Sequence, residues 1–266
     1  MALSPLVMGI VNVTADSFYP GSRTLMADDA IARGRSHFEA GCDIVDVGGE
    51  STRPGATLVS ADEEIARVVE VVAALSKYGP VSIDTQKAKV ARAAVAAGAS
   101  VINDVSATLL NVAGELGVGY VAMHRQGDAS TMQVNPTYVD VVDEVITFLR
   151  ALAERAWALK VSPMWVDPGI GFGKTVEHNL ALLAHVDRFV AMARETGAGV
   201  LIGTSRKRFL AHLGEVELDV DQRLEGTVAT QAWAMLQGVS MVRVHDAAAA
   251  VQLRELLSRP VEKEVA

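Results

Sequence analysis

The feature that most constrains the fold is an alternation of short β-branched runs with Ala-rich stretches, which repeats eight times along 266 residues. Each run has the length of a buried strand, and each following stretch carries apolar residues at helical spacing. The predicted strands are 6–11, 43–47, 80–84, 100–104, 119–123, 164–167, 199–203 and 240–244. The predicted helices include 28–40, 61–77, 87–97, 138–159, 176–196, 224–237 and 247–258.

Strands that are nearly all apolar and are separated by helices are typical of a parallel sheet covered on its outer face. Eight such units predict an α/β fold closed into a single (β/α)8 TIM barrel, and 266 residues is an ordinary length for one. An open doubly wound sheet is the alternative, but no GxGxxG turn follows the first strand. No linker interrupts the alternation, so we expect one domain over residues 1–266, with a frayed tail at about 259–266.

Charge and cysteine content restrict the possible partners. The formal net charge of -8 argues against sequence-independent binding to nucleic acid or to an anionic membrane surface. The N-terminal residues lack the pattern of a signal peptide, and no apolar window of about 18 residues could span a membrane. The sole cysteine, Cys42, cannot form an internal disulfide, so we interpret it as a buried structural thiol in a cytoplasmic protein.

Polar residues follow all eight predicted strands, at the end where the active site of such a barrel is built. Some of them fit a helix cap as well as a site, because they directly precede the next helix; these are Asp84, Asp104, Ser106 and Asp246. Asp167 is a stronger candidate for a site. Pro168 disfavours the usual capping geometry, and the glycines that follow allow a close approach to a ligand.

Basic residues after the last two strands favour an anionic ligand. Ser205, Arg206 and Lys207 are expected to open a helix, where backbone N–H groups attract anions. A phosphate or diphosphate could be held there directly or through a divalent ion, by Asn12, Ser51, Ser205, Lys207, Arg243 and His245. Arg206 and Arg208 have the alternative interpretation of solvated surface charges. No zinc, nucleophile-elbow or Walker motif is present.

Taken together, eight motifs resemble those of the dihydropteroate synthase family. They run in the family's order from Met8 to Asp246, and they are NVTADSF, GGESTRPGA, SIDT, INDVS, MH, DPGIGFGK, SRKRF and VRVHD. The resemblance implies a TIM-barrel transferase. Its reaction joins 6-hydroxymethyl-7,8-dihydropterin diphosphate to p-aminobenzoate, and it releases diphosphate to give 7,8-dihydropteroate.

The resemblance also implies a role for each matching position. The pterin would lie among Asp84, Asn103, Met123, Asp167, Gly203, Lys207 and Arg243. The diphosphate would meet Asn12, Arg243 and His245, with Mg²⁺ bound to Asn12. The p-aminobenzoate would lie among Thr52, Arg53, Pro54, Gly171, Phe172, Ser205 and Lys207. Catalytic roles fall to Asp84, Lys207, Arg243 and His245, and a homodimer is expected, for which the apolar helix 224–237 is suited.

Two other functions remain open on the same barrel. One is a methyltransferase module that takes methyl from a reduced folate, but its ligand has no diphosphate and would leave the STRPG, SRK and VRVHD motifs unexplained. The other is a non-catalytic paralogue that binds a pterin. It is supported by a departure in the first loop, where the family's Ser-Asp-Gly-Gly is replaced by Tyr19, Pro20, Gly21 and Ser22.

Overall fold

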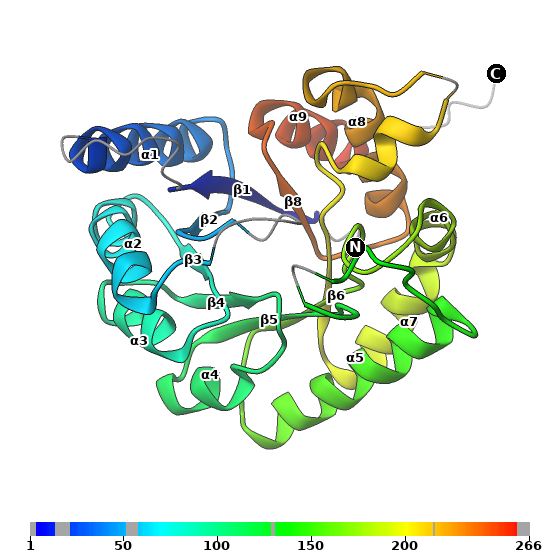
Figure 1. The fold of residues 1–266 in the computed structure, drawn as a ribbon, viewed down its shortest axis with the longest axis horizontal. Helices are drawn as coiled ribbons and strands as arrows, with labels where there is room; N and C mark the ends of the chain where they lie inside the picture. Colours follow the sequence, from blue (N-terminus) through cyan, green and yellow to red (C-terminus); the bar gives the residue numbers. More distant parts are fainter. Residues whose placement is uncertain (1–3, 14–21, 52–57, 129–130, 215, 260–266) are drawn as a thin grey trace.

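The computed structural model describes residues 4–13, 22–51, 58–128, 131–214 and 216–259, with no side chains for 22–25. Within these ranges the strands form a closed parallel barrel in sequence order (Figure 1). They are β1 (Leu6–Asn12), β2 (Ile44–Gly48), β3 (Val81–Asp84), β4 (Val101–Asp104), β5 (Gly119–Met123), β6 (Met164–Asp167), β7 (Gly199–Ile202) and β8 (Met241–Val244). The prediction of a (β/α)8 barrel is confirmed, and the doubly wound alternative is wrong.

Helices surround the barrel and cover the outer face of its strands (Figure 1). They are α1 (Ser22–Glu39), α2 (Ala61–Leu75), α3 (Ala88–Ala96), α4 (Leu110–Leu116), α5 (Val141–Ala158), α6 (Val176–Ala184), α7 (Val186–Thr196), α8 (Leu224–Leu236) and α9 (Ala247–Ser258). Two short 3-10 helices, η1 (Arg208–His212) and η2 (Val220–Arg223), lie between β7 and α8.

Four helical segments differ from the prediction. Helix α1 begins at Ser22, six residues before the predicted start at 28. The predicted helix 176–196 is divided at His185, whose ring Nδ1 donates to the carbonyl of Ala181 at 2.8 Å and whose backbone leaves the helical range. The short helix α4 was not among the predicted helices. The stretch after β7 forms η1 and η2 where a helix opening at Ser205 was expected.

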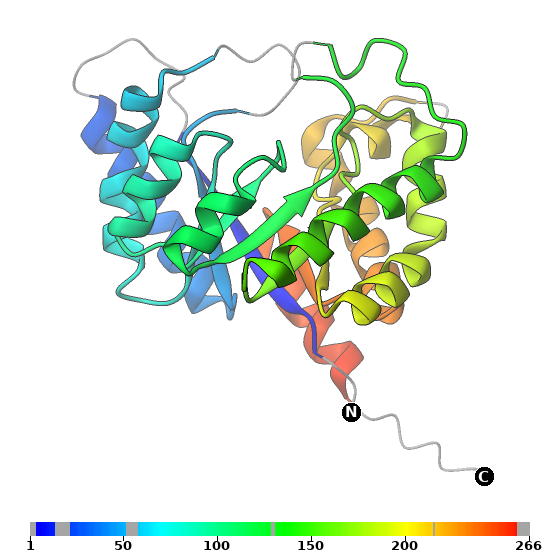
Figure 2. The same ribbon diagram turned by 90° about the horizontal axis from the view of Figure 1, so that it is seen from below.

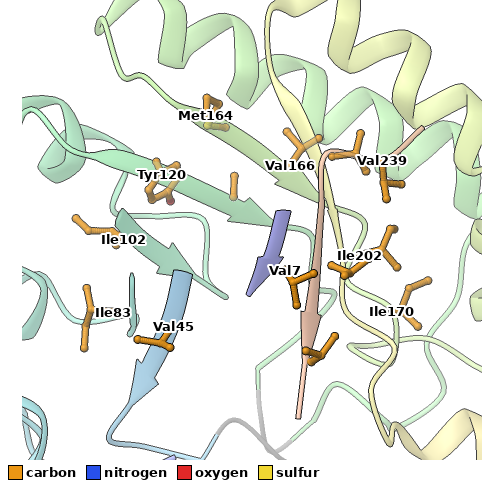
Figure 3. Close-up of a cluster of buried hydrophobic side chains, with 14 of the residues drawn as sticks. Val7, Val45, Ile83, Ile102, Tyr120, Met164, Val166, Ile170, Ile202 and Val239 are labelled. Atoms are coloured by element: carbon orange, nitrogen blue, oxygen red, sulfur yellow. The ribbon is translucent and has the colours of Figure 1, made fainter. Parts of the chain in front are cut away.

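The outward side chains of the strands make the main hydrophobic core with the helices. Along each strand the side chains alternate between the two faces of the barrel wall. Figure 3 shows several of the outward set, which packs against the helical layer: Val7, Val45, Ile83, Ile102, Tyr120, Val166 and Ile202. This layer accounts for the near-continuous apolar strands that the sequence displays.

The inward side chains form an apolar floor and a polar layer above it. The floor consists of Met8, Ile44, Val101, Val121, Trp165, Leu201 and Met241, all buried. Two residues further along the same strands, and therefore on the same face, come Ile10, Asp46, Asn103, Met123, Asp167, Gly203 and Arg243. Asp84 joins this layer, because it is paired in register with Gly48 and Asn103. Strand periodicity alone thus gathers most of the predicted pterin residues above one floor.

The candidate site lies at the end of the barrel opposite to Ser4 and Ser258, which are close to the first and last described residues. The start of β1 and the end of α9 meet at the amino end of the strands, where the hydroxyls of Ser4 and Ser258 are 3.4 Å apart (Figure 2). The site therefore occupies the loop-bearing carboxyl end, as in other barrels of this class. No helix in the described ranges is long and apolar enough to cross a bilayer.

Candidate active site

Arg243 lies at the centre of the polar layer and bridges two strands across the barrel. Its Nε donates to Asp46 Oδ2 at 2.6 Å, and its Nη2 donates to Asp84 Oδ2 at 2.7 Å. Asn103 donates from Nδ2 to the same Asp46 oxygen at 2.9 Å. Burial would lower the pKa of Arg243, but Asp46 and Asp84 outweigh that effect and raise it. The guanidinium is therefore a fixed cation, and its orientation is set by two carboxylates.

The carboxyl group of Asp84 has an unusually high pKa for an aspartate. Burial raises its pKa to about 7, against the attraction of Arg243, and the neighbouring Asp46 adds to the rise by repulsion. A carboxylate with a pKa in this range can change its protonation state under ordinary conditions. Groups of this kind gather at sites where charge changes during a reaction.

Asp46 is a member of the site that the sequence analysis did not single out. It is fully buried, and its Oδ1 has no hydrogen-bond partner in the described structure. A buried carboxylate oxygen without a partner is costly unless a ligand or an unseen group serves it. The available signal was an acidic residue inside the apolar run 43–47, at the inward position shared with Ile44.

Asp167 and Lys207 form the opposite side of the layer. Asp167 is 5 % exposed, and its Oδ1 accepts the Gly169 backbone N–H at 2.7 Å, so it closes a turn across Pro168. Burial raises its pKa, and the charge of Lys207 opposes that shift. Burial likewise lowers the pKa of Lys207 to about 8, while Asp167 opposes the shift. Each group thus favours the charged state of the other.

The ammonium of Lys207 also meets the loop that follows β6. It donates to the carbonyl of Ile170 and lies 4.7 Å from the centre of the Phe172 ring. Gly171 leaves room beside it, because a Cβ there would lie 3.2 Å from the Lys207 side chain, whereas a Cβ on Gly203 would make only an ordinary contact at 3.8 Å. Met123 is buried in the same layer, next to Asp167 in the register of β5 and β6. Gly171, Phe172 and Lys207 therefore lie together.

Two of the predicted diphosphate residues, Asn12 and His245, lie towards α1 and α9, whereas Arg243 lies in the polar layer. The Ser205 hydroxyl is 3.0 Å from His245 Nδ1 and accepts the His245 backbone N–H at 3.1 Å. A cavity of about 1150 Å³ between α1 and α9 includes Asn12, Arg33, His37, His245 and Asp246 in its lining. Asn12 is exposed at the end of β1. Of the polar layer, only Ile10 lines this cavity, and Arg243 does not.

Two expectations for the basic residues are wrong. No helix opens at Ser205: Arg206 adopts a left-handed φ of 54°, Lys207 is extended, and only the five-residue η1 follows. The interpretation of Arg206 as a solvated surface charge also fails. Its guanidinium donates to both oxygens of Asp246, at 2.9 and 2.6 Å, and to Asp221 at 3.1 Å. Arg208 is exposed, as expected.

The residues with an alternative capping role are now separated. Asp104 is structural, because it accepts backbone N–H groups of the following turn and the Tyr120 hydroxyl at 2.7 Å. Ser106 is structural as well, because its hydroxyl donates to Asp104 Oδ1 at 2.6 Å within the same turn. Asp84 and Asp246 are ion-paired, and Asp246, at the N-cap position of α9, makes no side-chain capping hydrogen bond. Cys42 is buried, as predicted, and burial raises the pKa of its thiol to about 12. Thr52, Arg53, Pro54, Tyr19, Pro20 and Gly21 lie outside the described residues.

This arrangement combines features suited to a flat, polar heterocycle with an anionic substituent. An enclosed carboxylate and a lysine face an amide and a fixed guanidinium, and all of them rest on an apolar floor. Asp167 and Asn103 can serve a hydrogen-bonding edge, while the guanidinium of Arg243 offers a planar cationic face. Among the described residues, no cluster of three His, Cys, Asp or Glu side chains could hold a metal by itself.

Comparison with known proteins agrees with this geometry. Residues 8–245 match the family model described as pterin binding enzyme. Dihydropteroate synthase from Mycobacterium leprae is 44% identical over 94% of this chain and 92% of its own. That from Escherichia coli K12 is 40% identical over 91% of this chain and 86% of its own. The Xanthomonas albilineans dihydropteroate synthase solved with 4-aminobenzoic acid has a TM-score of 0.85 and 42% identity, with 96% and 94% of the two chains covered. The chain therefore belongs to the pterin-binding enzyme family, together with the dihydropteroate synthases.

Proposed function

We propose that this chain is a dihydropteroate synthase, which condenses 6-hydroxymethyl-7,8-dihydropterin diphosphate with p-aminobenzoate. The observation that carries the proposal is the inward layer in which Asp167, Asn103, Lys207 and Arg243 meet above an apolar floor. Similar structures have been solved with 4-aminobenzoate and with 7,8-dihydropteroate. Among the three functions that the sequence left open, these relatives favour the synthase.

The pterin is bound through its edge and its face. The carboxylate of Asp167 accepts two hydrogen bonds from the amino group and ring N–H of the pterin, while Asn103 and Lys207 serve the remaining edge. Arg243 stacks its guanidinium on the ring, with Asp46 and Asp84 holding that plane in place. Met123 and Gly203 complete the pocket wall.

The diphosphate lies near Asn12, Arg243 and His245. The donor set fits Mg²⁺, because this ion keeps several waters and is held chiefly by substrate phosphates, so one exposed amide oxygen from Asn12 is an adequate protein contribution. When bound, Mg²⁺ would neutralise charge on the leaving diphosphate. His245 is held near Ser205 and supplies a further donor at that end of the site.

The reaction needs no protein nucleophile. The bond between the pterin methylene and the diphosphate oxygen breaks first, and diphosphate leaves with the electron pair beside Arg243 and His245. The carboxylate of Asp84 stabilises the cationic dihydropterin that remains. The amine of p-aminobenzoate then forms the new C–N bond and loses a proton. We place this substrate beside Gly171, Phe172, Ser205 and Lys207, and the family pattern adds Thr52, Arg53 and Pro54.

We also propose that the chain forms a homodimer through an α6–α8 surface. This surface is defined by Leu180, Trp233 and Leu236, which are 43, 47 and 67% exposed. The indole Nε1 of Trp233 donates to the carbonyl of Leu183 at 2.9 Å, so α8 meets α6 next to these exposed side chains. Exposed apolar residues grouped in this way are typical of an association surface.

Product analysis tests the assigned reaction. The purified chain is incubated with the pterin diphosphate, p-aminobenzoate and Mg²⁺, and the product is identified by mass spectrometry. We expect 7,8-dihydropteroate, formed in amounts equal to the amine consumed. Formation of a methylated cobalamin from a methylated folate, without dihydropteroate, would instead support the methyltransferase. Pterin binding without either product would support the non-catalytic paralogue.

A further inference from the structure

A buried lysine, Lys174, lies just outside the candidate site, in the loop between β6 and α6. The side chain of Lys174 is 3% exposed. Its Nζ is 3.0 Å from His124 Nδ1 and donates to the carbonyls of Phe172 at 3.0 Å and Gly169 at 3.1 Å. The carbonyl of His124 lies at 3.4 Å. Burial lowers the pKa of Lys174 to about 7, against the attraction of Asp167, and the four polar atoms nearest to its Nζ are three carbonyl oxygens and an imidazole nitrogen.

These acceptors belong to two loops that are fitted closely together. A Cβ on Gly169 would lie 1.8 Å from the carbonyl oxygen of His124, and one on Gly173 would lie 2.4 Å from that of Gln126. Both glycines have left-handed φ values, of 70° and 63°. The loop after β5 adds a hydrogen bond from the Tyr138 hydroxyl to the Gly173 carbonyl at 2.8 Å. The Nζ of Lys174 bridges the two loops, through His124 on one side and through Gly169 and Phe172 on the other.

The opposite side of the same loop faces the candidate site. Between the two carbonyls that Lys174 binds lies Ile170, whose carbonyl accepts the ammonium of Lys207. Gly169 donates its N–H to Asp167, and the Phe172 ring lies against Lys207. The segment that Lys174 holds in place is therefore the one that contacts Asp167 and Lys207.

We propose that Lys174 is a positioning residue of the synthase, which fastens the loop from Gly169 to Phe172 so that Asp167 and Lys207 are held in their binding geometry. The inference rests on the proposed function and deepens it. Lys174 itself does not touch substrate, because its ammonium is enclosed by the two loops. An ammonium has three donors for four nearby acceptors, and an apolar side chain of the same length would satisfy none of them.

Lys174→Met tests the proposal, because it keeps the length of the side chain and removes every donor. We expect KM for both substrates to rise about tenfold or more, with a smaller fall in kcat, since misplaced binding groups weaken both subsites. Hydrogen exchange without substrates should show that amides 169–172 lose protection. This second measurement does not depend on the reaction, so failure of the proposed function would not obscure it.

Two further variants make the test specific. Val72→Ala truncates a buried residue of α2, remote from both loops, and should lower the melting temperature without changing either KM or the exchange of 169–172. His124→Phe keeps the ring volume and removes one acceptor, so it should raise both KM values by a smaller factor; it also carries the test if Lys174→Met does not fold. The proposal would be overturned if Lys174→Met and His124→Phe left both KM values and the hydrogen exchange of amides 169–172 unchanged.

Discussion

At the scale of single residues, Asp167 is the side chain on which pterin recognition depends. It is enclosed, and one of its oxygens already accepts the Gly169 N–H. Asp167→Asn preserves the shape but replaces a charged acceptor by a mixed donor and acceptor. Hydrogen bonds to charged groups contribute about 1.5–3 kcal/mol each, so we expect affinity for the pterin diphosphate to fall at least about a hundredfold. Titration calorimetry measures this.

Asp143→Asn is the matched control for that measurement. Asp143 lies on α5, and it pairs with Arg188 at 2.6 Å on the surface. Because exposed ion pairs contribute little, this change should leave both stability and pterin affinity nearly unaltered. Normal binding by Asp167→Asn would show that the pterin edge is read by a different group.

The pKa values of Asp84 and Lys207 predict a bell-shaped pH profile for kcat/KM, which reports the free enzyme. Burial raises the pKa of Asp84 to about 7, so the required carboxylate is lost as pH falls through that value. Burial lowers the pKa of Lys207 to about 8, so the required ammonium is lost as pH rises through it. Steady-state rates measured between about pH 5.5 and about pH 9.5 extend beyond both pKa values and test this expectation.

Variants assign each limb of that profile. Asp84→Asn should lower the rate and remove the acidic limb, while Lys207→Arg should shift the alkaline limb upward because a guanidinium stays charged. An acidic limb that persists unchanged in Asp84→Asn would assign that titration to another group.

The sequence identified site residues that lie at the end of a strand, but it did not identify a site residue that lies within a strand. Asp84, Asn103 and Asp167 stand out because they end apolar runs. Asp46 lies within a run, and its importance depends on Arg243, nearly 200 positions away along the chain. Arg206 could not be paired with Asp246 from the sequence, because that contact depends on how two loops are folded across neighbouring strands.

At the scale of elements, the close contact between the loops after β5 and β6 requires a glycine at position 169. Gly169→Ala would place a Cβ 1.8 Å from the His124 carbonyl oxygen, at a φ of 70°. Gly197→Ala has the same kind of strain, with a φ of 72°, but its Cβ would meet no atom within 4 Å. We expect Gly197→Ala to cost about 1 kcal/mol of unfolding free energy and Gly169→Ala at least about 2 kcal/mol more.

Urea denaturation of the two variants separates strain from steric conflict. Gly169→Ala should also raise KM for the pterin diphosphate, since the displaced loop carries the Asp167 contact, whereas Gly197→Ala should not. Equal losses of stability in the two variants would mean that the loops can separate without cost.

Helix prediction shows which local signals were sufficient. The long α5 was predicted within a few residues, because its apolar period is strong and Asp140 caps its first turn. The division of 176–196 depends on one histidine side chain, which donates to a carbonyl of the preceding turn. The segment after β7 contains no long periodic pattern, and Arg206, just before η1, is held by contacts to Thr227 and Asp246, which lie later in the chain.

At the scale of the whole molecule, the α6–α8 surface predicts association. Leu236→Asp places a charge at its centre, which should dissociate the proposed dimer at micromolar concentration in sedimentation velocity. Leu256→Asp is the control, because Leu256 on α9 has the same exposure of 67% and lies outside that surface. The proposed dimer surface would be wrong if Leu256→Asp dissociated the protein and Leu236→Asp did not.

The barrel itself was fully predictable, since eight apolar strands alternating with helices leave few other ways to bury both faces of a parallel sheet. The polar layer follows from the same periodicity, because inward positions two residues beyond the floor are fixed once the strands are known. What the sequence could not supply is the direction of each charged side chain, which is set by pairs formed between distant strands.

Release of diphosphate by the wild-type chain is the measurement that tests the central claim most directly. The pterin diphosphate and Mg²⁺ are supplied, and diphosphate is followed with and without p-aminobenzoate. We predict sustained, multiple-turnover release only when the amine is present, with one diphosphate for each dihydropteroate formed, and a loss of that release in Asp167→Asn. Sustained release at the same rate without the amine, or no release from a chain that binds the pterin diphosphate, would contradict the assignment.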